Sequence, residues 1–289
     1  MGLARTTANN AGTAQEPAPD TLAALLKLGR PLVMGILNVT PDSFSDGGRF
    51  LDPEEAVRRA RAMIGEGADI LDVGAESTRP GSTPVAAEEE WRRLEPVLSP
   101  VIALGTPVSI DTMKAAIAER ALRAGAAIVN DVWGLQRDPA MAEVVARHGA
   151  PVVIMHNRAA ADPALDILDD IEGFFRRSLA LAERAGIARA RIVLDPGIGF
   201  GKTAEQSIAA IANLDRLAAF GLPLLMGLSR KRFVASVSRS EVERRLGGSL
   251  AGNVLAVAFG AAIVRVHDVA ETVQALRVAR AILAARRDA

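Results

Sequence analysis

The chain repeats one pattern eight times: a short apolar run, a few polar residues, and then a longer helical stretch. The helical stretches, such as EEAVRRARAMIGEGA, carry apolar residues at three- and four-residue spacing. Strands that alternate with helices favour a parallel sheet with right-handed crossovers. Eight such units in about 250 residues are typical of a (β/α)8 barrel, with a doubly wound open sheet as the alternative. The apolar runs cover residues 32–37, 70–74, 108–110, 126–129, 152–155, 192–194, 224–228 and 262–266.

Composition excludes several classes of function. The 289 residues include 34 basic and 34 acidic side chains, so no net field would attract nucleic acid or an anionic membrane. The absence of cysteine excludes disulfides, thiolate metal sites and cysteine nucleophiles, and it agrees with a cytoplasmic location. No apolar run reaches membrane-spanning length. We therefore expect small-molecule ligands, with no nucleic acid and no membrane as partner.

Domain organisation is predicted to be simple. The first twenty residues are small, polar and proline-bearing, which predicts a disordered N-terminal tail over 1–20 rather than a signal peptide. No Gly/Ser-rich linker divides the remainder, so residues 21–289 are predicted to form one barrel domain.

Polar side chains follow nearly every apolar run, where barrels place their functional groups. Side chains alternate along a strand, so Ser229 and Lys231 should share one face, as should Arg265 and His267. If that face is the barrel mouth, these cations lie beside carboxylates and an amide. A salt bridge in the core is the alternative for any single residue, but it explains the whole set poorly. The strand ends carry Asn38, Glu76, Asp111, Asn130, His156, Asp195, Lys231 and His267.

Such a mixture suits a ligand with two different ends. Carboxylates and an amide can accept the N–H groups of a flat amino-oxo heterocycle. Arginine, lysine and histidine suit a phosphate or pyrophosphate.

Two apparent motifs fail on inspection. The segment DPGIGFGKT at 195–203 resembles a phosphate loop, but Pro196 stands where that loop requires glycine. Lys202 likewise occupies the third glycine position of the dinucleotide pattern. The glycines are expected instead to let the backbone approach a bound ring. His148 and His156 lack an HExxH partner, so a surface position or an indirect role is expected for both.

Seven motifs in one order resemble the dihydropteroate synthase family: GILNVTPDSFSDGG, DVGAESTRPGS, SIDT, NDVWG, LDPGIGFGKT, GLSRKRF and RVHDV. The resemblance extends from about residue 32 to 268. It implies condensation of 6-hydroxymethyl-7,8-dihydropterin pyrophosphate with 4-aminobenzoate in folate biosynthesis, in an enzyme that sulfonamides target. It also implies a homodimer.

The resemblance assigns roles to particular residues. It implies catalytic roles for Asn38, Arg79, Asp111, Lys231, Arg265 and His267. The implied pterin pocket contains Asp111, Asn130, Asp195 and Lys231, with Met155 and Phe200 as apolar walls. The implied pyrophosphate site contains Asn38, Arg265 and His267, with Asn38 also a ligand of Mg²⁺. Thr78, Arg79 and Pro80 resemble a second mobile loop, and Ser229 the edge of the aminobenzoate site.

Two loops are expected to close over the ligands, and a third departs from the family pattern. Residues 40–48 and the loop after the second strand would exclude water and create the aminobenzoate pocket. After His156 the chain reads NRAAADPALDILDD, without the Gly-x-Pro-x-x-Met-Gln stretch of many members. No catalytic role is therefore assigned to His156, Asn157 or Arg158.

Three rival functions are weighed against this interpretation. A pterin-binding methyltransferase barrel would not need all of these loops. A paralogue that binds pterin without catalysis should have lost Asn38, Arg79, Asp111 or Lys231, and the sequence retains all four. A phosphate-binding barrel of sugar metabolism would not explain the carboxylate pocket.

Overall fold

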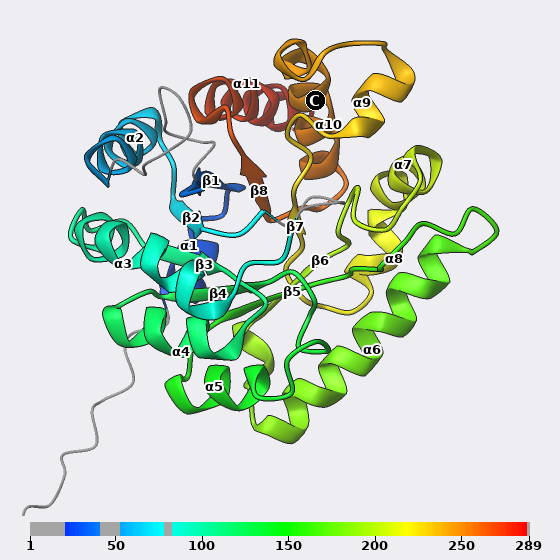
Figure 1. Cartoon of the computed structure of the whole chain (residues 1–289). Coiled ribbons are helices and arrows are strands. Elements are labelled where there is room, and N and C mark those ends of the chain that lie inside the picture. The colour runs from blue at the N-terminus through cyan, green and yellow to red at the C-terminus, as the bar shows by residue number, and fades with distance from the viewer. Residues whose placement is uncertain (1–20, 41–52, 78–82, 288–289) are drawn as a thin grey trace, which may run out of the picture.

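A computed structural model describes residues 21–40, 53–77 and 83–287, and within these residues eight strands form one parallel sheet (Figure 1). The hydrogen-bonded order is β6-β5-β4-β3-β2-β1-β8-β7, so neighbours in the chain are neighbours in the sheet. The strands are β1 (Leu32–Asn38), β2 (Ile70–Gly74), β3 (Val108–Asp111), β4 (Ile128–Asp131), β5 (Val152–Met155), β6 (Ile192–Asp195), β7 (Leu225–Met226) and β8 (Ile263–Val266).

The two ends of this order meet and close the sheet into a barrel. Leu194 and Leu224 form a parallel bridge, and the Leu194 N–H donates to the Pro223 carbonyl at 3.0 Å. An open doubly wound sheet would leave both edge strands unpaired, and its strand order would reverse at a switch point. The predicted (β/α)8 barrel is therefore confirmed, and the open-sheet alternative is wrong.

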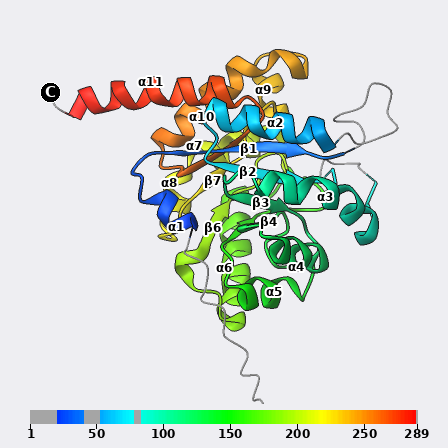
Figure 2. The same ribbon diagram turned by 90° about the vertical axis from the view of Figure 1, so that its left-hand side faces the viewer.

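Helices cover the outside of the barrel, with at least one after each strand (Figure 2). Helix α7 begins at a capping box, in which the Gln206 N–H donates to Thr203 Oγ1 at 3.1 Å. Among the described helices, none is both long and apolar enough to span a membrane. The helices are α1 (Thr21–Leu26), α2 (Pro53–Glu66), α3 (Ala87–Ile102), α4 (Ala115–Ala124), α5 (Met141–His148), α6 (Ile167–Ala185), α7 (Ala204–Ala212), α8 (Leu214–Ala218), α9 (Arg232–Val237), α10 (Leu246–Ala258) and α11 (Val269–Arg287), with short 3-10 turns at Arg189–Arg191 and Val242–Arg244.

Strand side chains alternate between two apolar cores. One core lies between the sheet and the surrounding helices. The other fills the N-terminal half of the barrel interior, where Leu22 of α1 packs against it. This inner core forms a floor, so the polar side chains further along the strands face into the C-terminal half of the barrel. The floor contains Leu32, Met34, Ile70, Ile128, Val153, Val193, Leu225 and Ile263.

The seventh strand is shorter than the predicted run of 224–228. It ends at Met226, and the chain then turns, with Arg230 in the left-handed conformation at φ 57°. Ser229 and Lys231 therefore lie in a turn, where the alternation of strand side chains does not apply. The prediction that these two residues share a strand face is wrong, although both still reach the barrel mouth.

Candidate functional site

One guanidinium joins two carboxylates inside the barrel. Arg265 of β8 donates through Nε to Asp72 Oδ2 of β2 at 2.5 Å, and through Nη2 to Asp111 Oδ2 of β3 at 2.6 Å. Asn130 of β4 donates to the same Asp72 oxygen at 3.1 Å. Because Asp72 is fully buried and Asp111 nearly so, Arg265 neutralises charge that the interior would otherwise strongly disfavour.

Several acceptors of this cluster have no partner. Asp72 Oδ1, Asp111 Oδ1, Asn130 Oδ1 and Ser109 Oγ are buried and make no hydrogen bond within the described part of the chain. Buried polar atoms are nearly always paired in folded proteins, so a group of unpaired acceptors indicates a ligand that supplies donors. The N–H groups of a flat heterocycle are donors of that kind.

Asp195 and Lys231 form the opposite wall. Asp195 ends β6, and its Oδ1 accepts the Gly197 N–H at 2.7 Å. Lys231 reaches across from the turn after β7 and donates to the Ile198 carbonyl. Its Nζ also lies 4.7 Å from the centre of the Phe200 ring. The loop after β6 thus wraps the lysine and leaves its charge beside Asp195.

Burial and neighbouring charges shift the pKa of each ionisable group here. Burial raises the pKa of Asp111 and of Asp195 above the ordinary range, while Arg265 and Lys231, respectively, act in the opposite direction. Burial lowers the pKa of Lys231 to about 8, with Asp195 opposing the shift. Burial also acts to lower the pKa of Arg265, but Asp72 and Asp111 outweigh it and hold that pKa above its ordinary value. The interior is an ion-pair network in which arginine is always charged.

The remaining predicted residues surround this network. Met155 ends β5 and is 3 % exposed, next to Asp195 in the strand register. Ser229 Oγ lies 3.0 Å from His267 Nδ1 and accepts the His267 N–H at 3.2 Å. The structure therefore places Ser229 against the predicted pyrophosphate residue His267, at one side of the mouth.

Asn38 ends β1, where it pairs in register with Gly74. Its amide makes no recorded hydrogen bond within the described residues and is partly exposed. Those residues contain no group of three His, Asp or Glu side chains that could hold a metal. One amide oxygen fits a Mg²⁺ ion that takes its other ligands from phosphate and water. Thr78, Arg79, Pro80 and most of 40–48 lie outside the described residues, so their roles stay predictions.

Two interior residues were missed in the sequence. Asp72 lies inside strand β2, four residues before Glu76, and Ser109 lies inside strand β3, two residues before Asp111. A charged residue inside the apolar run ILDVG was the available signal, because an unpaired aspartate is rarely buried. Alternation would then have placed Asp72 on the same face as the floor residue Ile70.

The loops after β5 and β6 pack backbone to backbone. A Cβ on Gly197 would lie 1.9 Å from the His156 carbonyl oxygen, and one on Gly201 would lie 2.4 Å from Arg158 Cβ. These two glycines therefore let one loop approach the other, while the expected approach of this backbone to a bound ring stays a prediction. His156 is fully buried, so the expected surface position is wrong for this residue.

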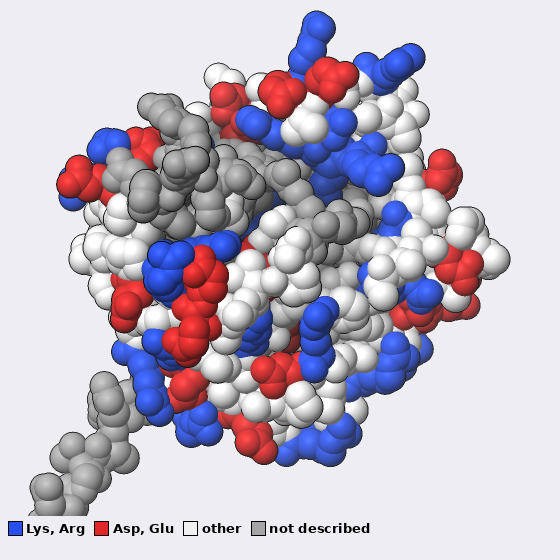
Figure 3. All heavy atoms as spheres, in the orientation of Figure 1, with Lys and Arg blue, Asp and Glu red and all other residues white. Residues whose placement is uncertain are grey.

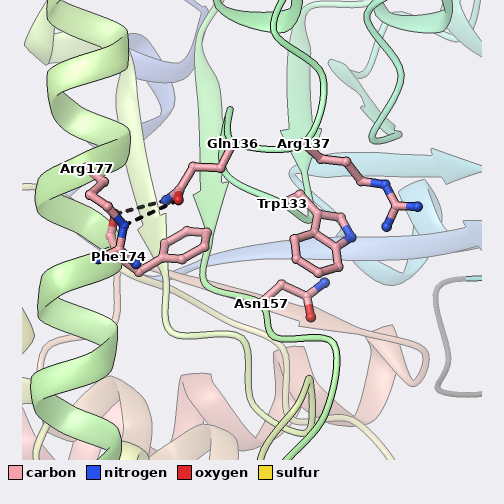
Figure 4. Close-up of a pocket in the computed structure, with 6 residues that line it drawn as sticks. All are labelled: Trp133, Gln136, Arg137, Asn157, Phe174 and Arg177. Carbon is pink, nitrogen blue, oxygen red and sulfur yellow. Dashed lines mark hydrogen bonds between the residues drawn. The ribbon is translucent and has the colours of Figure 1, made fainter.

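A hollow of about 400 Å³ lies on the outer side of the barrel wall (Figure 4). Its amides serve the protein itself: Gln136 donates to Ser178 Oγ at 2.8 Å, and Asn157 donates to the Val132 carbonyl at 2.9 Å. None of the predicted site residues lines it. The lining residues are Trp133, Gln136, Arg137, Asn157, Phe174 and Arg177.

A barrel with an apolar floor and an ionic, acceptor-rich interior defines a class of enzyme that binds a flat polar heterocycle. The sequence model of one family in this class, described as pterin binding enzyme, matches residues 34–267.

Individual relatives narrow the class. The dihydropteroate synthase of Bacillus subtilis (strain 168) is 44% identical over 262 residues, which cover 90% of this chain and 92% of that protein. A structure of Xanthomonas albilineans dihydropteroate synthase with 4-aminobenzoic acid aligns with a TM-score of 0.85 at 45% identity, over 89% of this chain and 94% of that one. Another from the same organism, in complex with 7,8-dihydropteroate, gives 0.82 at 43% identity, over 89% and 95%. The chain belongs to the dihydropteroate synthase family.

Proposed function

We propose that this barrel joins 6-hydroxymethyl-7,8-dihydropterin pyrophosphate to 4-aminobenzoate and releases 7,8-dihydropteroate and pyrophosphate. The unpaired buried acceptors Asp111 Oδ1 and Asn130 Oδ1, beside the Lys231 ammonium, are the observation that carries the proposal. Family membership supports it, since the similar Xanthomonas structures hold 4-aminobenzoic acid in one case and 7,8-dihydropteroate in the other.

Pterin recognition follows from the donors and acceptors of the interior. Asp111 and Asn130 accept ring N–H groups from one side, and Asp195 accepts from the other. Lys231 donates to the ring carbonyl, where an ammonium makes a charge-assisted hydrogen bond. Met155 and Phe200 supply apolar faces for the flat ring.

The chemistry requires no side-chain nucleophile. The bond between the pterin methylene carbon and the pyrophosphate oxygen breaks, and its electron pair leaves with pyrophosphate. The lone pair of the aminobenzoate nitrogen forms the new C–N bond, and that nitrogen then loses a proton. Asp111 and Asp195 favour the positive charge that develops on the pterin as the leaving group departs.

Pyrophosphate is held next to the pterin pocket, by residues at the ends of the neighbouring strands β8 and β1. Two of the five Arg265 donors are committed to Asp72 and Asp111, which leaves N–H groups for phosphate oxygens. His267 and Asn38 complete this side, and Asn38 would hold Mg²⁺. When bound, the metal would supply a Lewis acid that stabilises charge on the leaving group. Arg79 and Thr78 are proposed to contribute from the second loop.

Surface charge supports the arrival of two anionic substrates. Figure 3 shows Lys and Arg side chains gathered over α9 and α10, while acidic and basic side chains alternate over much of the remaining face. Local positive charge beside a cleft raises the rate at which anions arrive, even on a chain of zero formal net charge.

The deciding experiment measures pyrophosphate release that depends on 4-aminobenzoate, with the dihydropterin pyrophosphate and magnesium present. Turnover with formation of 7,8-dihydropteroate is expected. Folded protein that binds a pterin but releases no pyrophosphate would instead identify a binding module. Methyl transfer from a methylated pterin would identify a methyltransferase.

A second copy of the chain is the proposed partner, and the cytoplasm the proposed location. Helices α10 and α11 lie side by side on the outside of the barrel (Figures 1 and 2). This part of the chain exposes several large apolar side chains. In a two-fold dimer the same patch serves both copies, so one apolar face suffices. The patch contains Leu255, Phe259, Val278, Ile282 and Leu283.

A further inference from the structure

A buried series of hydrogen-bonded ionic side chains, Lys202, His156 and Asp170, lies behind the pterin wall and takes no part in the proposed reaction. Lys202, only 8 % exposed, places Nζ 2.6 Å from His156 Nδ1. His156 Nε2 lies 2.9 Å from Asp170 Oδ2 on α6, and Arg158 donates to the same oxygen at 2.9 Å. This series of contacts connects the loop after β6 to helix α6 on the outside of the barrel.

The contacts define where the protons lie. Lys202 Nζ has three acceptors, namely His156 Nδ1, the Gly197 carbonyl at 2.9 Å and the Phe200 carbonyl at 3.2 Å. Three acceptors match the three N–H groups of an ammonium. Burial lowers the pKa of Lys202 to about 7, with Asp195 opposing the shift, so this ammonium is fully present on the acid side of neutral pH. His156 Nδ1 is then an acceptor, so Nε2 carries the proton and donates to Asp170. Burial and the nearby Lys202 charge lower the pKa of His156 to about 3, which keeps the ring neutral.

These bonds act on the backbone that forms the pterin pocket. The Gly197 carbonyl accepts from Lys202, while its N–H donates to Asp195 Oδ1 at 2.7 Å. Between the two carbonyls held by Lys202 lies that of Ile198, which accepts from Lys231. One ammonium therefore holds the peptide groups that orient both Asp195 and Lys231.

We propose that Lys202 is a positioning residue for pterin recognition, held in place by His156 and Asp170, which fixes the loop after β6 so that Asp195 and Lys231 meet the pterin. The inference rests on the proposed function. Lys202 acts through Asp195 and Lys231 and does not itself touch the substrate. The close contact of Gly197 with the His156 carbonyl also restricts the position of that loop.

The main test replaces Lys202 by methionine, which keeps the length and removes the charge. We expect Lys202→Met to weaken the binding of 6-hydroxymethylpterin, measured by calorimetry, by about 30-fold, the usual effect of losing charge-assisted bonds. The KM for the pterin pyrophosphate should rise with it, while the KM for 4-aminobenzoate stays within about twofold. The control is Lys27→Met, an exposed lysine just after α1 at the N-terminal end of the barrel.

A second variant distinguishes positioning from general support. His156→Phe keeps a ring against Phe174, whose ring centre lies 4.9 Å from that of His156, but removes the acceptor for Lys202. It should weaken pterin binding about fivefold alone and add almost nothing to Lys202→Met in the double variant, because both act through one chain of contacts. If Lys202→Met does not fold, Asp170→Asn provides the same comparison, because Asp170 is the residue at the other end of this series of contacts.

The pH profile gives a readout that a purely structural role would not change. Lys202, Lys231 and Arg265 all lower the pKa of Asp195, which burial raises. Loss of the Lys202 charge should raise the pKa of Asp195 further, and so move the acid-side loss of pterin affinity to higher pH.

Failure of the inference and failure of the proposed function are distinguishable. Pterin affinity of Lys202→Met within twofold of the parent, or additive effects with His156→Phe, would overturn the positioning role. A parent protein that does not bind the pterin at all would overturn the proposed function instead.

Discussion

At the scale of single residues, the partly buried Lys231 lowers the stability of the fold while it serves binding, because a low-dielectric interior disfavours an ammonium. Lys231→Ala removes this cost but also takes a counter-charge from the buried Asp195, so the protein should stay folded with little net change in melting temperature. Pterin affinity should fall at least about 100-fold, because a charge-assisted hydrogen bond to the ring is lost. Calorimetry with 6-hydroxymethylpterin measures the affinity, and Lys27→Ala is the control. Unchanged affinity would remove Lys231 from the site.

The same side chain predicts an alkaline limit on binding. Its pKa is lowered to about 8 by burial, so the ammonium is present below that pH and is lost as the pH rises through it. Pterin affinity in the parent protein should therefore fall above about pH 8, after correction for titration of the ligand itself. Constant affinity up to about pH 10 would contradict the assignment of Lys231 as the ring donor.

Sequence reasoning at this scale found the residues that end strands and missed those inside them. Asp111, Asn130 and Asp195 follow apolar runs, so their place at the barrel mouth could be predicted. The aspartate inside the run ILDVG was a signal for Asp72, but its role could not be predicted without knowing which residue opposes it across the barrel. Its function depends on Arg265, 193 residues away in the sequence.

At the scale of elements, the loop after β6 depends on glycine where it meets the loop after β5. Gly197 has φ +65°, and a Cβ there would lie 1.9 Å from a backbone oxygen that cannot move freely. Gly186 has φ +82° with no atom within 4 Å of such a Cβ. We expect Gly197→Ala to lower the free energy of unfolding by more than about 3 kcal/mol, against about 1 kcal/mol for Gly186→Ala. Urea unfolding measures both, and equal losses would contradict the contact.

A buried ion-pair cluster ties the β2–α3 loop to α4. Lys114 pairs with Glu76 and with the fully buried Glu90, at 2.6 Å from Glu90 Oε2. Glu76 Oε1 also accepts the Val85 N–H at 2.9 Å, so one carboxylate contacts both flanks of the loop. Lys114→Met should lower the free energy of unfolding by roughly 3 kcal/mol at neutral pH, because Glu90 is left without its counter-charge.

The sign of the pH dependence checks this explanation. Burial raises the pKa of Glu90 in the folded protein, although Lys114 and Thr112 oppose the shift. A carboxyl of raised pKa favours the folded state while it is protonated, and this contribution is lost as the pH rises through that pKa. The deficit of Lys114→Met should therefore be smaller near about pH 5 than near about pH 8. An equal deficit at both pH values would show that lost packing, rather than charge, is responsible.

The repeated pattern of runs and helices predicted the order and type of these elements. It could not predict where β7 ends, because that depends on a turn at Arg230. The Arg230 side chain is held by Asp268, and its N–H donates to Ser249 Oγ at 2.8 Å. Such contacts between distant segments leave no local signal in the sequence.

At the scale of the whole molecule, one end of the barrel interior is apolar and the other ionic, because on the interior face of each strand the apolar residues come before the polar ones. Floor residues such as Met34 and Ile263 precede the functional positions on the same interior face. The barrel was predictable from eight units, because each unit alone cannot bury its apolar surface. The exposed apolar face on α10 and α11 could not be predicted, because an apolar stretch such as 250–262 could equally have been part of the core.

That face predicts the state of assembly. Val278 is 56% and Ile282 64% exposed on α11, and Leu255 is 51% exposed on the neighbouring α10. Figure 2 shows α11 extending past the barrel, so in the single chain its last turns have little to pack against. Burial of such side chains between two copies stabilises a dimer by roughly 2 kcal/mol for each large residue.

Ile282→Asp should consequently weaken the proposed dimer, because it would place a carboxylate in the proposed apolar contact between the two copies. We expect the dimer dissociation constant to rise at least about 100-fold, measured by sedimentation over a range of concentrations. Leu28→Asp is the matched control, since Leu28 is 50% exposed next to α1, away from α11. A dimer that survives Ile282→Asp as well as it survives Leu28→Asp would place the contact on another face. A parent protein that stays monomeric at all concentrations would remove the proposed partner altogether.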